Sequence, residues 1–162
     1  MVKFVTGWLV GIICGFLLWS SYHVCVVEDA REEQDSLAIE LVQPEFFLSD
    51  TVNVELLQQA CDYYGIKHSD VVISQAILET GHFRSDLCIN DNNLFGLYNS
   101  YTEKFYSFSH WTESVKAYRD KVQYRYKDGN YYEWLERIGY AEDSLYVSKL
   151  KNIREKYNLV TE

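Results

Sequence analysis

The sequence has a single proline, four cysteines and fewer basic than acidic residues, and this composition excludes some classes of protein. Lysine and arginine number 15 against 24 aspartates and glutamates, so the net charge is −9. Because nucleic-acid binding depends on clustered basic side chains, and no such cluster is evident, we expect no nucleic-acid partner. Nearly half of the 162 residues are hydrophobic, which excludes a disordered protein and fits one compact domain with an appendage.

The cysteines and histidines lack the spacing of a metal site. Cys14 and Cys25 belong to the apolar N-terminal segment, and only Cys61 and Cys88 remain for the folded part. No CxxC or Cys/His spacing typical of zinc is present, and the four histidines are scattered. We therefore expect no metal and no cofactor. Cys61 and Cys88 can form a disulfide or remain as two buried free thiols, and the sequence leaves both alternatives open.

The segment from Phe4 to Val27 contains no charged residue. It is long enough to cross a membrane, which needs about 20 apolar residues. Lys3 precedes it and several acidic residues follow it, which predicts that the N-terminus lies inside and the rest outside. The sequence thus predicts a membrane-anchored, extracytoplasmic protein of the periplasm or cell envelope.

A cleaved signal peptide is the alternative interpretation, and it predicts a secreted protein. Signal peptides have a shorter apolar region and a small-residue cleavage site, which this segment lacks. We favour an uncleaved anchor over residues 1–27, a tether over 28–49 and one domain over 50–160.

Five later segments carry apolar residues at helical spacing. They are Val54 to Tyr64, Val72 to Ile77, Trp111 to Val122, Tyr131 to Ile138, and Tyr146 to Tyr157. We expect capping oxygens from the segment 68–70 for the second helix and from Asp143 or Ser144 for the last. Two short apolar runs between Gly81 and Ser109 predict a small hairpin. The expected fold is α+β and mostly helical, with most of the 14 tyrosines in its core.

Glu79 is expected in the last turn of the second helix, next to the break at Gly81. Poor solvation and the negative end of the helix dipole both raise the pKa of a carboxyl group there. A carboxyl that stays protonated near neutral pH can act as a general acid on a glycosidic oxygen. A solvated glutamate on a polar helix face is the alternative, and periodicity alone favours it.

Four short motifs, which follow one another along the chain, resemble those of a known enzyme family. They are Gln75 to Gly81, Asn92 to Gly96, Trp111 to Val115, and Gly139 to Asp143 with Tyr146 and Lys149-Leu150 after it. Over about residues 50 to 155 the chain resembles the bacterial peptidoglycan glucosaminidases of glycoside hydrolase family 73, which include flagellar-rod and autolysin types. The resemblance implies a lysozyme-like fold, hydrolysis of beta-1,4 bonds after N-acetylglucosamine in wall glycan, and Glu79 as the catalytic glutamate.

The hairpin is shorter than in many members of that family, in which it carries a second carboxylate. Glu103 is the only acid in this hairpin, so it is one candidate for the base that activates water. Glu113 is another candidate, although a capping or pairing role suits its place on a helix. Substrate-assisted hydrolysis, in which the N-acetyl group of the sugar is the nucleophile, needs no second carboxylate and is slightly favoured.

The resemblance also places Tyr140 and Tyr146 in the motif whose tyrosine faces the cleft, and Asn93, Phe95 and Gly96 on the cleft floor. Core packing remains the alternative for Tyr146 and Phe95. Two other functions stay open for the chain: a wall-binding module without catalysis, and a membrane-anchored scaffold that binds a protein through its tyrosines.

Overall fold

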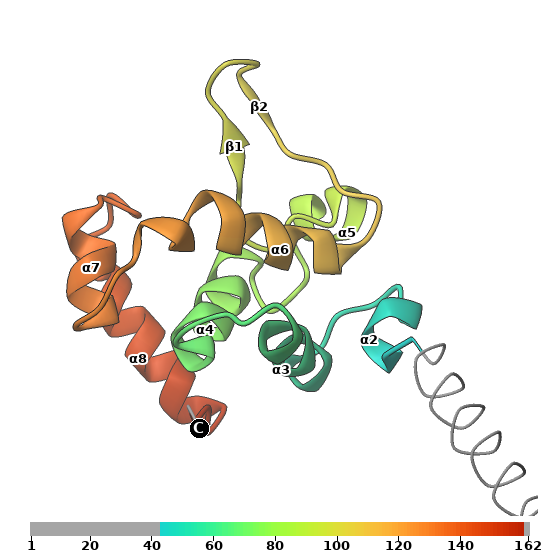
Figure 1. Cartoon of the computed structure of the whole chain (residues 1–162). Coiled ribbons are helices and arrows are strands. Elements are labelled where there is room, and N and C mark those ends of the chain that lie inside the picture. The colour runs from blue at the N-terminus through green and yellow to red at the C-terminus, as the bar shows by residue number, and fades with distance from the viewer. Residues whose placement is uncertain (1–42, 161–162) are drawn as a thin grey trace, which may run out of the picture. The chain divides into compact units, whose positions relative to one another are not determined.

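The computed structural model describes residues 43–160, and most of them lie in helices (Figure 1). The elements are α2 (Glu45–Leu48), α3 (Val54–Tyr63), α4 (Ser69–Glu79), α5 (Asp86–Asp91), β1 (Tyr98–Asn99), β2 (Lys104–Phe105), α6 (Trp111–Lys121), the 3-10 turn η1 (Gln123–Arg125), α7 (Tyr131–Arg137) and α8 (Tyr146–Lys156). The expected α+β, mostly helical class is confirmed. Within 43–160, no helix is both long and apolar enough to cross a membrane. The predicted anchor and most of the predicted tether lie outside the described residues.

Helix α4 is the most deeply buried element. Its residues from Ser69 to Ile77 are all buried, and only Leu78 and Glu79 are not. A helix whose residues are buried around its whole circumference needs neighbours on every side. Helices α3 and α8 pack against α4, and α6 packs against α3. Figure 1 shows α4 in the middle of the helices, with the hairpin projecting beyond α6.

Tyrosines fill much of the core near α7, as expected. Tyr126, Tyr131 and Trp134 are buried, and their ring centroids lie 4.8 to 5.3 Å apart. Tilted and edge-on contacts at this distance are the favourable arrangements for aromatic pairs. The rings attach α7 to the segment that follows η1.

The helix starts depart from the expected caps. Helix α3 begins as its sequence suggests, since the Asn53 Oδ1 atom accepts from the Leu56 N–H at 2.8 Å. The expected cap of α4 is wrong, because no side chain caps it. Its N-cap is His68, a left-handed residue (φ +52°) whose Nε2 pairs with the Tyr126 hydroxyl at 2.8 Å. Helix α8 also begins without a side-chain cap bond; Asp143 accepts instead from the N–H of Leu145, the residue before that helix.

Two short helices were missed in the sequence. Helix α2 falls inside the predicted tether, and the compact unit begins at Pro44 rather than near residue 50. Its Phe46 is buried, with its ring centroid 5.5 Å from that of Tyr63. Helix α5 falls in the region where no helix was expected, and Ser85 caps it by accepting from the Cys88 N–H at 3.2 Å.

The predicted hairpin is present, although its strands are shorter than the apolar runs. Strands β1 and β2 pair antiparallel, with Tyr98 opposite Phe105 and Asn99 opposite Lys104. Helix α6 also ends earlier than expected, at Lys121, where η1 follows it.

Cys61 and Cys88 are both buried free thiols, so the disulfide alternative is wrong. Burial raises the pKa of both thiols. Both cysteines therefore act as small apolar side chains of the core.

Truncation of Leu150 tests the packing of α8 on α4. Leu150 is fully buried, so Leu150→Ala is expected to lower the free energy of unfolding by about 2 to 5 kcal/mol, measured by urea denaturation. Ser148→Ala, an exposed change on the same helix, should alter it by less than about 0.5 kcal/mol. Equal effects of the two changes would contradict this packing.

Candidate active site

Glu79 occupies the last position of α4, as the sequence predicts, and the chain turns sharply after it. Gly81 has a left-handed backbone (φ +55°), which a side chain disfavours. The His82 N–H then donates to the carbonyl of Ile77 at 2.8 Å, which closes the helix end. Thr80 is buried and donates to the carbonyl of Ala76 at 2.6 Å. Glu79 is therefore held at the point where the buried helix meets the surface.

The Glu79 carboxyl has one side toward solvent and one side toward a tyrosine. Tyr146 donates its hydroxyl proton to the Glu79 Oε1 atom at 2.9 Å. Burial raises the pKa of Glu79 above its ordinary 4.5, while the hydrogen bond from Tyr146 lowers it, and burial prevails. The raised pKa that the helix-end position predicts is thus present, with desolvation as its main cause.

A buried chain of hydrogen bonds supports Tyr146 from behind. Gln75 donates through Nε2 to the Tyr146 hydroxyl at 3.2 Å and accepts through Oε1 from the Tyr118 hydroxyl at 2.7 Å. The Tyr118 hydroxyl lies 3.0 Å from that of Tyr131. Each of these side chains is buried, and a satisfied network in such a place is rigid.

Sequence reasoning missed the role of Gln75 and Tyr118. One signal was present, because Gln75 is a polar residue between Ile73 and Ile77 on a helix with no polar face. A buried amide of this kind needs hydrogen-bond partners. Which partners it has depends on α6 and α8, and that is decided by tertiary structure.

Tyr140 joins Glu79 and Tyr146 in one cluster. The Tyr140 and Tyr146 ring centroids lie 5.7 Å apart, and the Tyr140 hydroxyl donates to the backbone carbonyl of Phe95 at 3.4 Å. Burial raises the pKa of Tyr140 strongly, and the nearby charge of Glu79 raises it further. Three of the four predicted catalytic residues are therefore together.

Asn93 holds the loop before the hairpin and is not free for a ligand. Its Nδ2 donates to the carbonyls of Leu97 and Tyr106, both at 2.9 Å, and its Oδ1 accepts from the Leu97 N–H at 2.9 Å. The side chain is 1% exposed, so direct sugar contact is not its role. Phe95 is likewise buried, with its ring centroid 4.5 Å from that of Tyr118, and Gly96 supplies a left-handed turn (φ +61°). The motif shapes the site through its backbone.

Glu103 and Glu113 make no contact that joins them to the cluster of Glu79, Tyr140 and Tyr146 in the part of the chain that the structure describes. Glu103 is an exposed turn residue between β1 and β2 with φ +53°. Glu113 accepts from the Ser109 backbone N–H at 3.2 Å and from the Ser109 hydroxyl at 2.7 Å, at the start of α6. Within the described residues, neither carboxylate is hydrogen bonded to Glu79, Tyr140 or Tyr146.

Two hollows each have one tyrosine of this cluster in their lining, and Glu79 lines neither of them. One, of about 500 Å³, lies between the hairpin and the end of α6, with Tyr98, Tyr106 and Tyr140 in its lining. The other, of about 290 Å³, has Tyr146 in its lining together with the segment 141–144. Ring faces with polar tips suit a sugar, which is apolar on its faces and polar at its rim.

Comparison with protein families gives the class of enzyme. The family described as mannosyl-glycoprotein endo-beta-N-acetylglucosaminidase matches residues 54–159. The chain belongs to the glucosaminidase family. The expected family is thereby confirmed, and the protein is a glycoside hydrolase. The matched residues include all of the elements from α3 to α8 and hence the whole cluster around Glu79.

Among solved structures, the glucosaminidase is similar to the catalytic domain of the autolysin Auto from Listeria monocytogenes. The two are 23% identical, with a TM-score of 0.49, over 80% of this chain and 94% of that one. No curated protein sequence matches the chain significantly.

The raised pKa of Glu79 predicts how stability depends on pH. The folded state binds the proton of the Glu79 carboxyl more tightly than the unfolded state does. The contribution of the protonated carboxyl to the free energy of unfolding is therefore full below about pH 4.5, and it is lost as the pH rises through the folded pKa. Glu79→Gln removes this loss. Urea unfolding should show equal stability of the two proteins at pH 4 and an advantage of Glu79→Gln that grows as the pH rises and levels off above the folded pKa of Glu79. A constant difference across this range would contradict the raised pKa.

A double-mutant cycle tests the pair of Gln75 and Tyr118. Either Gln75→Leu or Tyr118→Phe leaves a buried polar atom without its partner and should cost about 1 to 3 kcal/mol of unfolding free energy. The double variant should cost clearly less than the sum, because both partners are then apolar. Additive losses in urea denaturation would show that the two side chains are not coupled.

Proposed function

We propose that this glucosaminidase hydrolyses the beta-1,4 bond after N-acetylglucosamine in the glycan strands of peptidoglycan, with Glu79 as the general acid. One observation supports this role above the others. The Glu79 carboxyl has a pKa raised by burial, a hydrogen bond from Tyr146 and an open side. The order of the motifs around Glu79 supports peptidoglycan as the substrate.

In the proposed reaction, the Glu79 carboxyl gives its proton to the glycosidic oxygen as the bond to the sugar carbon breaks. Tyr146 then stabilises the carboxylate that is left, since its hydroxyl already donates to Oε1. In the first step an oxygen of the substrate itself forms a bond to the sugar carbon as the leaving group departs. In the second step a water molecule attacks that carbon, the bond to this oxygen breaks, and Glu79 takes up the proton of that water. Glu79 thereby returns to its protonated form.

The nucleophile of the first step is the N-acetyl oxygen of the substrate. This assignment rests on the positions of the other acids, because Glu103 is in an exposed turn and Glu113 is engaged with Ser109. Retaining hydrolases of the substrate-assisted kind need no second protein carboxylate. The proposed contact of that N-acetyl group is Tyr140, and its packing beside Tyr146 supports this role.

The proposed enzyme has a lysozyme-like cleft between the hairpin and the helices. It works outside the cytoplasm, anchored to the membrane by residues 1–27, or secreted if that segment is cleaved. The support for this location is the uncharged run from Phe4 to Val27. Peptidoglycan lies on that side of the membrane, so location and substrate agree.

Digestion of purified peptidoglycan with the full chain tests the assignment of Glu79. New reducing ends are expected from the unaltered protein, and Glu79→Gln should lower kcat by about 10²- to 10⁴-fold because the acid is lost. Glu133→Gln, a matched change of an exposed glutamate on α7, should leave the rate unchanged. Glu103→Gln should also stay active if the substrate supplies the nucleophile.

Equal release by the unaltered protein and Glu79→Gln would show that Glu79 is not the acid. Binding to the wall without any release would instead indicate a module that has lost catalysis. Neither binding nor release, with a stable protein partner, would indicate the scaffold.

A further inference from the structure

The fold gathers basic side chains that are scattered in this acidic chain. Two hollows adjoin each other, because Asp120 and Tyr124 line both. One is the hollow beside Tyr140, and the other, of about 580 Å³, lies between the segment after α3 and the end of α6. Together we call them the basic groove. Its cations are Lys67, Arg119, Lys121, Arg125 and Lys127.

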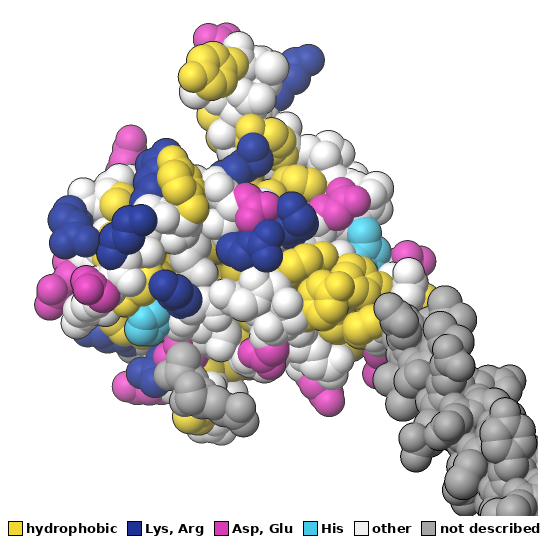
Figure 2. Space-filling model, in the orientation of Figure 1, with side chains coloured by type: hydrophobic (Ala, Val, Ile, Leu, Met, Phe, Trp, Pro, Cys, Tyr) yellow, Lys and Arg dark blue, Asp and Glu magenta, His cyan; other side chains and the backbone are white. Residues whose placement is uncertain are grey.

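The charge of the groove is opposite to that of the chain. The lining of the groove contains five basic residues and one acidic residue, Asp120, whereas the whole sequence has 15 basic and 24 acidic residues. Asp120 is already neutralised by Arg119 at 2.7 Å and Lys116 at 2.8 Å, and hydrogen bonds from these two lower the pKa of Asp120 to about 2. The positive charge of Lys67, Lys121, Arg125 and Lys127 therefore remains. Figure 2 shows Lys and Arg side chains gathered over α6 and its neighbours on this face.

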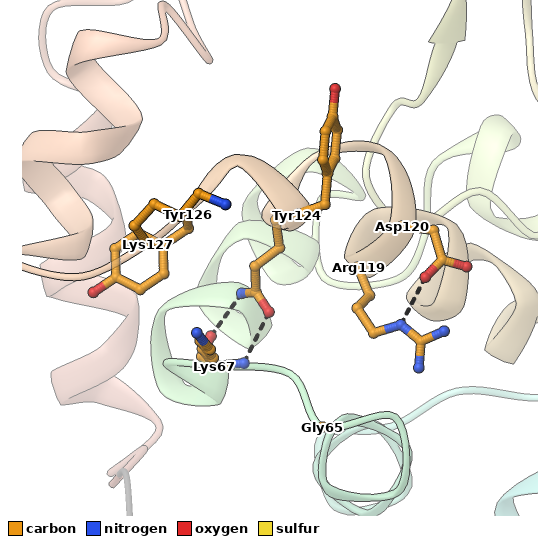
Figure 3. A pocket seen from close by; sticks show the side chains of 8 residues that line it. Gly65, Lys67, Arg119, Asp120, Tyr124, Tyr126 and Lys127 are labelled. Atoms are coloured by element: carbon orange, nitrogen blue, oxygen red, sulfur yellow. Dashed lines mark hydrogen bonds and ion pairs between the residues drawn. The ribbon is translucent and has the colours of Figure 1, made fainter.

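The outer hollow has a fixed frame. Gln123 is buried and holds the backbone of Lys67 twice: it accepts from the N–H at 2.9 Å and donates to the carbonyl at 2.7 Å. Arg119 donates to the carbonyl of Tyr64 at 3.2 Å. These bonds tie the loop before α4 to α6 and η1, so the backbone that carries Lys67 is held in place; Figure 3 shows the two bonds to the Lys67 backbone.

Tyr124 marks the passage between the two hollows. It is 59% exposed, and its ring points away from Gly65 and Lys67, toward the hairpin side (Figure 3). Arg125 lies over this ring, 5.4 Å from the centroid, and donates to its hydroxyl at 3.1 Å. An extended ligand can thus pass from Tyr140 over Tyr124 into the outer hollow.

From this geometry we infer that the basic groove binds a carboxylate-bearing peptide attached to the glycan, so that the enzyme selects glycan strands with peptide stems. The inference rests on the proposed function. The sugars that lie at Tyr140 in that proposal carry no charge that needs five cations. The peptide stems of the wall have free carboxylates, and ammonium and guanidinium groups are their natural partners.

Two substrates separate this inference from the proposed function. One is peptidoglycan with its stems, and the other is the same peptidoglycan after its free carboxylates have been converted to amides. The double variant Lys67→Gln/Lys127→Gln in the full chain should raise KM for the unmodified peptidoglycan by about 2- to 30-fold, with kcat unchanged. It should leave cleavage of the amidated peptidoglycan unaltered. Lys151→Gln/Lys156→Gln, which removes the same charge from exposed positions of α8, should change neither.

A binding measurement gives a second, independent readout. Titration calorimetry of the full chain with a free stem peptide should detect binding that weakens with salt and disappears in Lys67→Gln/Lys127→Gln. The same peptide with amidated carboxylates should not bind.

Each outcome has one meaning. An equal KM change on both substrates, no change on either, or equal binding of the amidated peptide overturns the inference. Cleavage of the amidated peptidoglycan together with any of these leaves the proposed function intact. Cleavage of neither substrate, with peptide binding present, refutes the proposed function while the basic groove stands as a peptide site.

Discussion

The hydrogen bond from the Tyr146 hydroxyl to the Glu79 carboxyl is the contact on which the site depends. Its effect on the pKa of Glu79 is opposite to that of desolvation. Burial favours the protonated form of the Glu79 side chain, whereas the hydrogen bond from the Tyr146 hydroxyl favours the carboxylate. An acid that must give up a proton and then recover it needs both influences. With burial alone the carboxylate would be too costly, and with full hydration the pKa would be ordinary. Glu79, at the end of the buried helix α4, lies between full burial and full hydration.

The balance between burial and this hydrogen bond, which together set the pKa of Glu79, depends on a fixed position of the Tyr146 hydroxyl. The polar residues inside the apolar core hold that hydroxyl in place. Gln75 uses both of its functional atoms, one toward Tyr146 and one toward Tyr118, and so connects α8 to α6 across α4. The network continues through Tyr131 to Gln123, whose amide also fixes the backbone of Lys67. The support of Tyr146 and the frame of the basic groove are thus parts of one buried hydrogen-bond network.

The sequence predicts the long helices and the place of Glu79, because burial of an apolar stripe produces a period that can be counted. It does not predict α2 or α5, which have four and six residues and owe their stability to tertiary contacts such as the burial of Phe46. The role of Asn93 is hidden for a related reason. An asparagine that binds sugar and one that binds three backbone groups look identical until the loop has folded around it.

Electrostatics explains why Lys67, in the outer hollow of the basic groove, and Glu79 lie at opposite ends of α4. A cation beside Glu79 would stabilise the carboxylate and lower its pKa, which would leave too little of the protonated acid. Burial and Tyr146 are the influences on the pKa of Glu79, and no lysine or arginine is among them. Lys67 lies just before α4 and Glu79 at its last residue, so 11 helical residues of roughly 16 Å separate them, more than the screening length of about 8 Å at physiological salt. In the proposed reaction, Lys67 could therefore attract an anionic part of the substrate without lowering the pKa of Glu79.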